Sequence, residues 1–357
     1  MLMSFHHYYP QLKWKPAEYE SLMQLEQKTI DGLTPIITIP DIDWDHENDC
    51  YKKSLNAYLS NFGSNLASSW PTDRPIILDV KYLDAHGTNR HHPLDMCIQD
   101  ARSFGKEIIP VVSSVSSQNY IHAIQRNLTN GIAISITPQT WHLFGQLINQ
   151  FNLHPSFIDV IIDFGDIQNA DDNIKQLALS VFNSLVGQAH WRSLIISSTA
   201  YPTSQTGIPQ HQIHPIPRHE YDLWYYVVHN TNLNRTPSFS DYPTASSTIT
   251  SVDPRFMSQY VAVRYSNDTS WIFVKGTAVK GNGWGQTKNL CNILVSSPIY
   301  SAYGPQFSWG DDYINQRALG INKSGGSKEW RKVAHTHHLK LVVTQLTRLA
   351  QSLPARP

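Results

Sequence analysis

The chain has 357 residues, and its 28 lysine and arginine residues balance its 28 aspartate and glutamate residues. A net charge of zero argues against a protein that coats nucleic acid without sequence preference, although a local basic patch is compatible with it. The 41% hydrophobic content, with 11% aromatic residues, supplies enough apolar surface for a core and so excludes a disordered chain.

The sequence also indicates a compartment. No apolar run approaches the roughly 18 to 20 residues that a membrane-spanning helix needs. The first residues lack the charged start and long apolar stretch of a secretory signal. The three cysteines, Cys50, Cys97 and Cys291, are odd in number and far apart, which fits a reducing compartment. We therefore expect a soluble, cytoplasmic protein that does not associate with membranes.

Short β-branched runs alternate with helical stretches along most of the chain. Seven of these runs are nearly continuously apolar, as expected for parallel strands with both faces covered. They lie at residues 8–15, 34–40, 75–82, 108–112, 131–137, 158–164 and 193–199. Between them, apolar residues recur at helical spacing. This order of elements predicts an α/β fold with a parallel sheet.

A candidate eighth strand over residues 238–242 completes the series. Eight such units predict a (β/α)8 barrel of the TIM-barrel type, with an open doubly wound sheet as the main alternative. The glycine-rich first turn typical of dinucleotide-binding sheets is missing from the sequence. A β-hairpin, with strands over 261–265 and 271–275, is inserted near the eighth unit, and a helix over 286–295 resumes the outer layer.

The last sixty residues differ from this pattern. Thr336 has the position of an N-cap for a terminal helix whose apolar residues follow the 3.6-residue period. From Tyr313 to Pro357, eight Lys and Arg residues stand against Glu329 alone, a local charge of 8 − 1 = +7. We divide the chain into a barrel-like domain over 1–299 and a C-terminal loop and helix over 300–357, packed on the barrel as one structural domain overall.

Several segments, in order over nearly the whole chain, resemble the phage "beta protein" family of phages, prophages and bacterial genomes. They are Tyr9–Lys15 with Glu18, Pro35–Pro40, Ile161–Gly165, Phe239–Tyr242, Trp271–Gly276, Phe307–Asp311, Trp330–Arg331 and Thr336–Leu339. The resemblance implies a barrel-like α/β fold and a role in phage–host conflict, but it supplies no reaction. This sequence departs from the family pattern at Thr38, where the family has an acidic residue. The departure puts a catalytic role for that position in doubt.

In a barrel enzyme the chemistry lies where the strands end. The candidate catalytic acids are Asp79, Asp163 and Asp241, each at or just after the end of a strand. Lysines at the same level would hold phosphate oxygens, and these are Lys13, Lys15 and Lys81. The carboxylates could instead hold a divalent cation, or pair with the lysines for structure alone. The metal ligands are left unknown.

The basic tail forms a second constellation. A helix that begins at Thr336 would present free N–H groups and a partial positive charge beside His337 and His338, which are candidate proton donors. Arg331 would contact phosphate in the same site. Trp309 and Asp311 are further candidates for substrate binding, with the indole as a platform for a base. The alternative is a solvated basic helix with surface histidines.

Three functions remain open from the sequence. The first is a barrel hydrolase acting on a phosphate-containing substrate, a nucleotide or a nucleic acid. The second is a non-catalytic module that senses a phage component or docks a co-encoded effector through exposed aromatic residues. The third is salt-dependent binding of nucleic acid through the basic tail, without hydrolysis. The first requires the acids and the basic tail to surround one cavity, and the second predicts that they are scattered.

Overall fold

The computed structural model describes residues 7–249 and 258–352. Eight parallel strands form one sheet in the order β1-β2-β5-β6-β7-β8-β9-β11. They are β1 (Gln11–Lys13), β2 (Ile36–Thr38), β5 (Ile76–Asp79), β6 (Ile108–Ser113), β7 (Ile132–Ile136), β8 (Ile158–Asp166), β9 (Ser193–Thr199) and β11 (Ser238–Ser240). The predicted eighth strand is therefore confirmed.

The sheet curls into a nearly closed barrel because its first and last strands meet. Tyr8 forms a parallel bridge with Phe239. The Tyr9 and Gln11 backbone N–H groups donate to the Phe239 and Asp241 carbonyl oxygens at 2.9 and 2.8 Å. This closure confirms the barrel and rules out the open doubly wound sheet.

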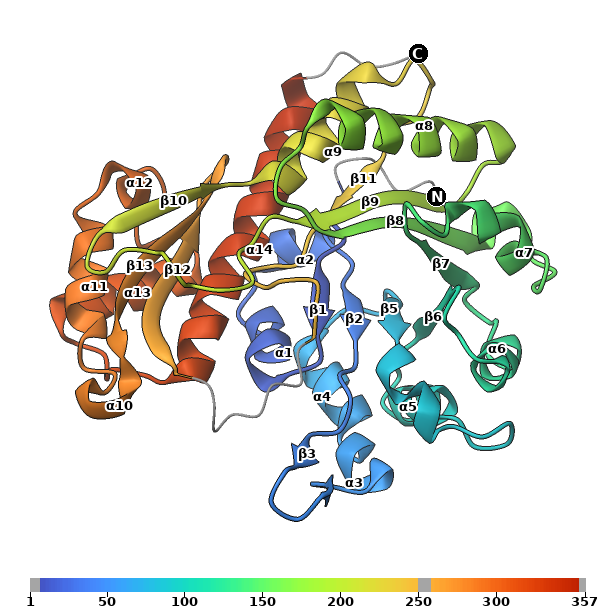
Figure 1. The fold of residues 1–357 in the computed structure, drawn as a ribbon, viewed down its shortest axis with the longest axis horizontal. Helices are drawn as coiled ribbons and strands as arrows, with labels where there is room; N and C mark the ends of the chain where they lie inside the picture. Colours follow the sequence, from blue (N-terminus) through green and yellow to red (C-terminus); the bar gives the residue numbers. More distant parts are fainter. Residues whose placement is uncertain (1–6, 250–257, 353–357) are drawn as a thin grey trace.

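Helices cover the outside of the barrel, because each strand presents one apolar face outward (Figure 1). They are α1 (Pro16–Leu22), α2 (Gln27–Asp31), α3 (Leu55–Leu59), α4 (Phe62–Ser69), α5 (Pro93–Ser103), α6 (Gln118–Gln125), α7 (Phe144–Ile148), α8 (Asp172–Gln188) and α9 (His219–Asn230). A two-stranded hairpin, β3 (Trp44–Asp45) and β4 (Cys50–Tyr51), projects from the segment after β2. None of the helices that the structure describes is both long and apolar enough to cross a membrane.

A second, antiparallel sheet lies beside the barrel (Figure 1). Its order is β10-β13-β12, with β10 (Ile213–Pro217), β12 (Tyr260–Ser266) and β13 (Ser270–Ala278). The β12–β13 pair confirms the predicted hairpin. The edge strand β10 falls in a Pro- and His-rich segment that we expected to be a loop. An edge strand tolerates Pro215 and Pro217 because one side of its backbone needs no ladder bonds.

Five helices follow this sheet, and the last one joins it to the barrel. They are α10 (Val279–Asn282), α11 (Thr287–Val295), α12 (Pro298–Ser301), α13 (Trp309–Leu319) and α14 (Ser327–Ser352). Trp330 and Val333 of α14 pack into the core around the second sheet, whereas Leu339 and Val342 pack into the barrel's outer core. Because α14 belongs to both cores, the division at residue 300 stays a prediction.

Helix α14 differs from expectation at its start. It begins at Ser327, nine residues before Thr336, so the predicted N-cap at Thr336 is wrong. The Thr336 hydroxyl donates to the Lys332 carbonyl oxygen at 2.7 Å, as a threonine inside a helix does. His337 and His338 therefore have no free helix N–H groups beside them, and the predicted anion site at that terminus is absent.

Candidate functional site

Side chains on the inner face of the barrel change from apolar to polar toward the carboxyl ends of the strands. The apolar layer includes Ile36, Ile77, Ile161 and Ile195. Successive side chains of a strand alternate between its two faces, so the residue two positions later shares the inner face. Those next inner residues are polar: Thr38, Asp79, Asp163 and Ser197. The strands thus end in a polar layer where the active sites of such barrels form.

Asp163 is the central acid of this layer. The Tyr242 hydroxyl donates to its Oδ2 at 2.5 Å, and the Gly165 backbone N–H donates to its Oδ1 at 3.0 Å. Burial raises the pKa of Asp163, and this outweighs the hydrogen bonds and the charge of Lys81, which lower it. Gly165 has φ +63, a left-handed conformation that suits glycine. A raised pKa at the strand ends of a barrel marks Asp163 as a candidate acid–base residue.

Lys81 faces Asp163 from the end of β5. Its Nζ lies 3.4 Å from Asp79 Oδ2, and the negative charge of Asp79 raises the pKa of Lys81 despite its desolvation. Asp163 raises that pKa further. Asp79 also accepts the Lys81 backbone N–H at 2.9 Å, which fixes the turn that follows β5. Lys81 is therefore a charged ammonium group between two carboxylates.

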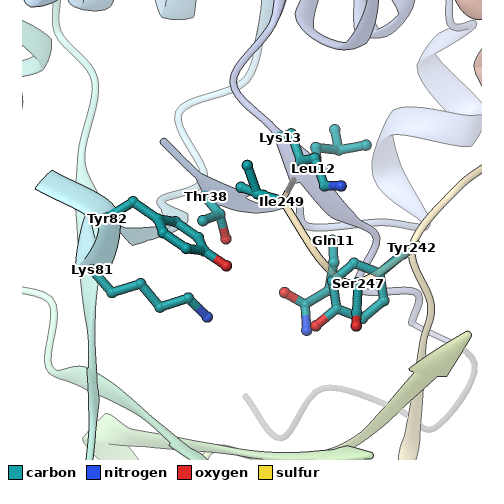
Figure 2. Close-up of a pocket in the computed structure, with 9 residues that line it drawn as sticks. All are labelled: Gln11, Leu12, Lys13, Thr38, Lys81, Tyr82, Tyr242, Ser247 and Ile249. Atoms are coloured by element: carbon teal, nitrogen blue, oxygen red, sulfur yellow. The ribbon is translucent and has the colours of Figure 1, made fainter. Parts of the chain in front are cut away.

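A small pocket, with a cavity volume of ≈ 20 Å³, opens in front of this layer. It is lined by Gln11, Leu12, Lys13, Thr38, Lys81, Tyr82, Tyr242, Ser247 and Ile249. In Figure 2, Lys81 and Tyr82 lie on one side of the opening, and Gln11, Tyr242 and Ser247 lie on the other. Two ammonium groups, an amide and several hydroxyls thus face one space, a set that suits an anionic oxygen-rich ligand.

One wall of the pocket is a segment after β11, residues 244–249, which we call the strap. Asp166 accepts hydrogen bonds from the Ser246, Ser247 and Thr248 hydroxyls and from the Ser247 backbone N–H, at 2.7–3.0 Å. Lys13 Nζ donates to the Ser246 and Thr248 carbonyl oxygens at 3.0 and 2.8 Å. Although desolvation opposes the change, the strap's hydrogen bonds lower the pKa of Asp166. The strap is therefore attached to the barrel from both sides.

Replacing Asp166 with alanine is expected to loosen the strap. Hydrogen bonds to a carboxylate contribute about 1.5–3 kcal/mol each, so the backbone amide of Ser247 should exchange with solvent deuterium at least about tenfold faster. Asp171→Ala, which removes the N-cap of α8 instead, is the matched control and should leave the strap unchanged. Equal exchange of residues 244–249 in both variants would contradict the role given to Asp166.

The structure places Asp241 outside this mouth. Ser240, at the end of the last strand, and Tyr242, two residues later, contact inner residues Ser197 and Asp163, so Asp241 between them faces outward, toward α14. It is 0% exposed, and it accepts hydrogen bonds from the Tyr8 hydroxyl and from His338 Nε2, the latter at 2.8 Å. Arg218 NH2 lies 3.6 Å from the same carboxylate. A catalytic role for Asp241 stays a prediction that this buried network does not support.

The two tail histidines are buried in networks of their own. His338 stacks on Trp271, with ring centroids 4.4 Å apart, and desolvation lowers its pKa to about 4. His337 Nδ1 is 2.9 Å from Asp311 Oδ2, and its ring stacks on Tyr265 at 3.7 Å. Neither histidine lines the pocket. A proton donor role for either one at the mouth stays a prediction without support from this placement, and Asp311 is equally enclosed.

The basic tail is largely paired with acids from elsewhere in the chain. Lys328 and Lys332 both approach Glu20, at 2.7 and 3.4 Å. Lys340 pairs with Glu26 at 2.7 Å, and Arg348 pairs with Asp268 at 2.9 Å. These acids offset much of the local charge of +7, which weakens the proposal of nucleic-acid binding through the tail.

The remaining predicted residues lie near the mouth or beside it. Lys15 is exposed just after β1. Desolvation is the main cause that lowers the pKa of Lys13, and the positive charges of Lys15 and Arg331 lower it further. Arg331 is therefore a residue of the tail that the fold brings to Lys13. Trp309 is half-buried, with Lys332 Nζ 5.0 Å from its ring centroid, and it does not line the pocket.

No group of three or more His, Cys, Asp or Glu side chains is arranged to hold a metal ion in the described parts of the chain. Asp79, 3.4 Å from Lys81 Nζ, and Asp163, whose charge acts on Lys81, are carboxylates at the strand ends. A divalent cation bound by these acids stays a prediction.

Sequence reasoning missed several residues of the mouth. Tyr242, Tyr82 and Gln11 all line the pocket, and the Gln11 amide donates to Ser197 Oγ at 2.9 Å. The signal that could have found them is the alternation of strand residues, because Gln11 and Tyr242 share a face with Tyr9 and Ser240. The buried ion pair of Arg218 with Glu220, at 3.1 Å, and the hydrogen bond from Arg218 to Gln345 of α14 had no such signal.

Comparison with known proteins gives a family and a fold. The sequence model of a family described as Beta protein matches residues 8–344. No curated protein matches the chain significantly. Among solved structures, two mutants of the tryptophan synthase α-subunit from the hyperthermophile Pyrococcus furiosus match 68% of this chain, one at 9% identity and the other at 10%. The matches cover 89% and 88% of those chains, each with a TM-score of 0.39. That similarity is too low to carry a functional argument.

Proposed function

This chain belongs to the Beta protein family, and from that premise we propose that it is a barrel enzyme that hydrolyses a phosphoester at the carboxyl ends of its strands. The observation that carries the proposal is the environment of Asp163. This carboxyl group has a raised pKa, accepts a hydrogen bond from Tyr242 and interacts electrostatically with Lys81. Acid–base catalysis needs a group poised between its two protonation states, and burial moves an aspartate toward that condition.

The proposed chemistry assigns one role to each group of the mouth. Lys81 holds the non-bridging phosphate oxygens, where an ammonium group stabilises the charge that develops during transfer. Asp163 in its ionised form accepts a proton from the attacking water. The new bond joins the water oxygen to phosphorus, the ester P–O bond breaks, and the leaving alkoxide takes a proton from a hydroxyl or from solvent. Tyr242 keeps the Asp163 carboxylate oriented toward the pocket.

The test of this proposal is turnover by wild-type protein and by Lys81→Met on a panel of phosphomonoesters, phosphodiesters and nucleotides, with and without Mg²⁺ or Mn²⁺. We expect kcat/KM to fall about 10²–10³-fold in Lys81→Met, the loss typical when one group that stabilises developing charge is removed. Lys53→Met, at an exposed lysine outside the barrel mouth, is the matched control. Lys81→Arg keeps the charge beside Asp79 and should retain part of the activity.

The proposal fails if wild-type protein turns over no member of the panel, or if Lys81→Met is as active as Lys53→Met. Its biological part is that the enzyme acts in antiviral defence, in the conflict between phage and host. This part rests on the occurrence of the family that the sequence resembles in phages, prophages and bacterial genomes. Phage plating on cells that express wild type or Lys81→Met examines it, and equal plating on both strains would contradict it.

A second candidate function is recognition of a phage protein or a co-encoded effector without catalysis. The observation that favours it is an exposed aromatic group on the projecting β3–β4 hairpin (Figure 1). Trp44 and Tyr51 are 38% and 44% exposed, and their ring centroids lie 4.9 Å apart. Tyr51 also contacts the His86 ring at 4.9 Å. Such aromatic residues are frequent anchors of interfaces. Under this function, Lys81→Met would keep full biological activity.

A further inference from the structure

Helix α9 carries a face of polar and aromatic residues that is open to solvent. Its opposite face packs into the barrel's outer core through Leu223, Trp224, Val227 and Val228. Residues of the open face recur at helical spacing, and each is exposed or half-buried. They are His219, Asp222, Tyr225, Tyr226, His229 and Asn230. Helix α9 therefore presents a continuous stripe of chemically active side chains on the outside of the barrel.

A groove with a cavity volume of ≈ 560 Å³ runs along this stripe, between α9 and the start of its neighbour α8 (Figure 1). All six residues of the stripe line the groove, and Asn169, Ala170, Asp171 and Lys175 line it from the α8 side. The stripe from His219 to His229 covers about 15 Å of helix, at 1.5 Å per residue. None of these residues lines the pocket at the barrel mouth. The groove is thus a separate, elongated site of the size that small-molecule ligands occupy.

Two tyrosine rings in the groove are held in place by their neighbours. The Gln176 amide of α8 donates to the Tyr226 hydroxyl at 2.7 Å, and Lys175 Nζ lies 5.7 Å from the Tyr226 ring centroid. Tyr225 stacks on His229, with ring centroids 3.9 Å apart, and is 41% exposed. Tyr225 therefore offers a preformed apolar surface to a ligand, and little conformational freedom is lost when a ligand packs on it.

The polar groups of the groove are mainly hydrogen-bond acceptors. His229 Nδ1 lies 2.9 Å from the Tyr225 carbonyl oxygen and donates to it, so Nε2 of the neutral ring is an acceptor. Asp171 Oδ1 accepts the Ile174 N–H at 3.1 Å, which leaves Oδ2 for a ligand. The Asp222 side chain is 58% exposed and adds a second carboxylate. Acceptors therefore occur along the whole length of the stripe.

A ligand that matches this groove carries many hydrogen-bond donors along its length and an apolar face for Tyr225. A chain of sugars has both, because each ring carries hydroxyl donors and a C–H face that packs on an aromatic ring. A nucleoside base carries its polar groups on one edge, and a polyamine would meet the positive charge of Lys175 within the groove. We propose that α9 and the start of α8 form a binding site for an oligosaccharide of neutral sugars. This inference goes beyond the proposed function, because the groove shares no lining residue with the barrel mouth.

The test is isothermal titration calorimetry with linear tetrasaccharides of glucose, N-acetylglucosamine, mannose and galactose as probes. Adenosine, guanosine and spermidine represent the competing ligand classes. We expect wild type to bind at least one tetrasaccharide, and Tyr225→Ala to bind it at least about tenfold more weakly, as when an aromatic anchor is removed from an interface. Asp222→Ala should also weaken binding. Tyr260→Ala, at a tyrosine of the second sheet with a matched exposure of 38%, should bind like wild type.

Three outcomes would overturn the inference. They are a wild-type protein that binds no tetrasaccharide, equal affinity in wild type, Tyr225→Ala and Asp222→Ala, and binding of a nucleoside or spermidine without binding of any sugar. If circular dichroism shows that Tyr225→Ala does not fold, Asp222→Ala decides the question, because its side chain is largely exposed. The proposed hydrolase is tested separately: Lys81→Met should bind the tetrasaccharide like wild type, whatever its effect on phosphoester turnover.

Discussion

Asp163→Asn is expected to lower kcat by about 10²–10⁴-fold on any phosphoester that the wild-type protein hydrolyses, the range typical for loss of a general acid–base group. Asparagine keeps the size of the side chain; its one carbonyl oxygen can accept the Gly165 N–H, and its NH2 group can donate to the Tyr242 hydroxyl oxygen in place of the bond that Asp163 accepts there. The fold and the pocket should therefore persist, and the loss should appear in kcat more than in KM. Steady-state kinetics with circular dichroism as a folding check measures both.

The pH dependence of wild-type kcat gives a second readout for Asp163. A base must be ionised, so kcat should fall as the pH drops through the pKa of Asp163. Because burial raises that pKa, the fall should lie above the range of an ordinary aspartate. Asp73→Asn, at an exposed acid before β5 at the opposite end of the barrel, should keep wild-type kcat and the same pH limb. Full activity of Asp163→Asn would remove Asp163 from the chemistry.

Asp241→Ala is expected to lower the free energy of unfolding by about 3–5 kcal/mol, the cost of breaking a buried ion pair by removing one partner. The change leaves the Tyr8 hydroxyl and His338 Nε2 without their acceptor and reduces the compensation of Arg218, all in the closed interior. Urea unfolding followed by tryptophan fluorescence measures the loss. The site predicted from sequence would instead make this variant stable and inactive.

Asp268→Ala is the comparison for Asp241. Its carboxylate pairs with Arg348 at 2.9 Å, but both side chains are largely exposed, at 42% and 55%. Pairs of this kind contribute about 0–1 kcal/mol. If Asp241→Ala lowers the free energy of unfolding no more than Asp268→Ala does, the network around Asp241 does not hold the barrel to α14. Any loss of kcat in a folded Asp241→Ala protein at low temperature would return Asp241 to the list of catalytic candidates.

The sequence predicted the barrel well because its signal is repeated. Each parallel strand is buried on both faces and reads as an apolar run, and the helix that follows it restores the helical period. Helices α5 (Pro93–Ser103) and α8 (Asp172–Gln188) occupy two of the stretches between the strands in which apolar residues recur at helical spacing. The acids Asp79 and Asp163 were found for the same reason, since they come at the ends of well-defined runs.

The placement of the other candidates could not be predicted where a single position decides it. A strand of three residues, such as β11, does not reveal which of Asp241 and Tyr242 faces inward, because one step along a strand reverses the face. In the sequence, Thr336, His337 and His338 resemble the polar N-terminus of a helix. In the structure they are buried, because the second sheet covers them.

The contact between the first and last strands of the barrel, where Tyr8 meets Asp241, has a consequence for how the chain folds during synthesis. The two residues are separated by 233 positions, and the ion pair of Lys328 with Glu20 spans 308. The outer edge of β1 therefore stays unpaired until β11 (Ser238–Ser240), the last strand of the barrel, has left the ribosome. Contacts so distant along the chain slow folding and prolong the exposure of strand edges to other chains. Slow refolding and a need for chaperones during synthesis would follow from this topology, and truncated products should aggregate rather than form a partial ring.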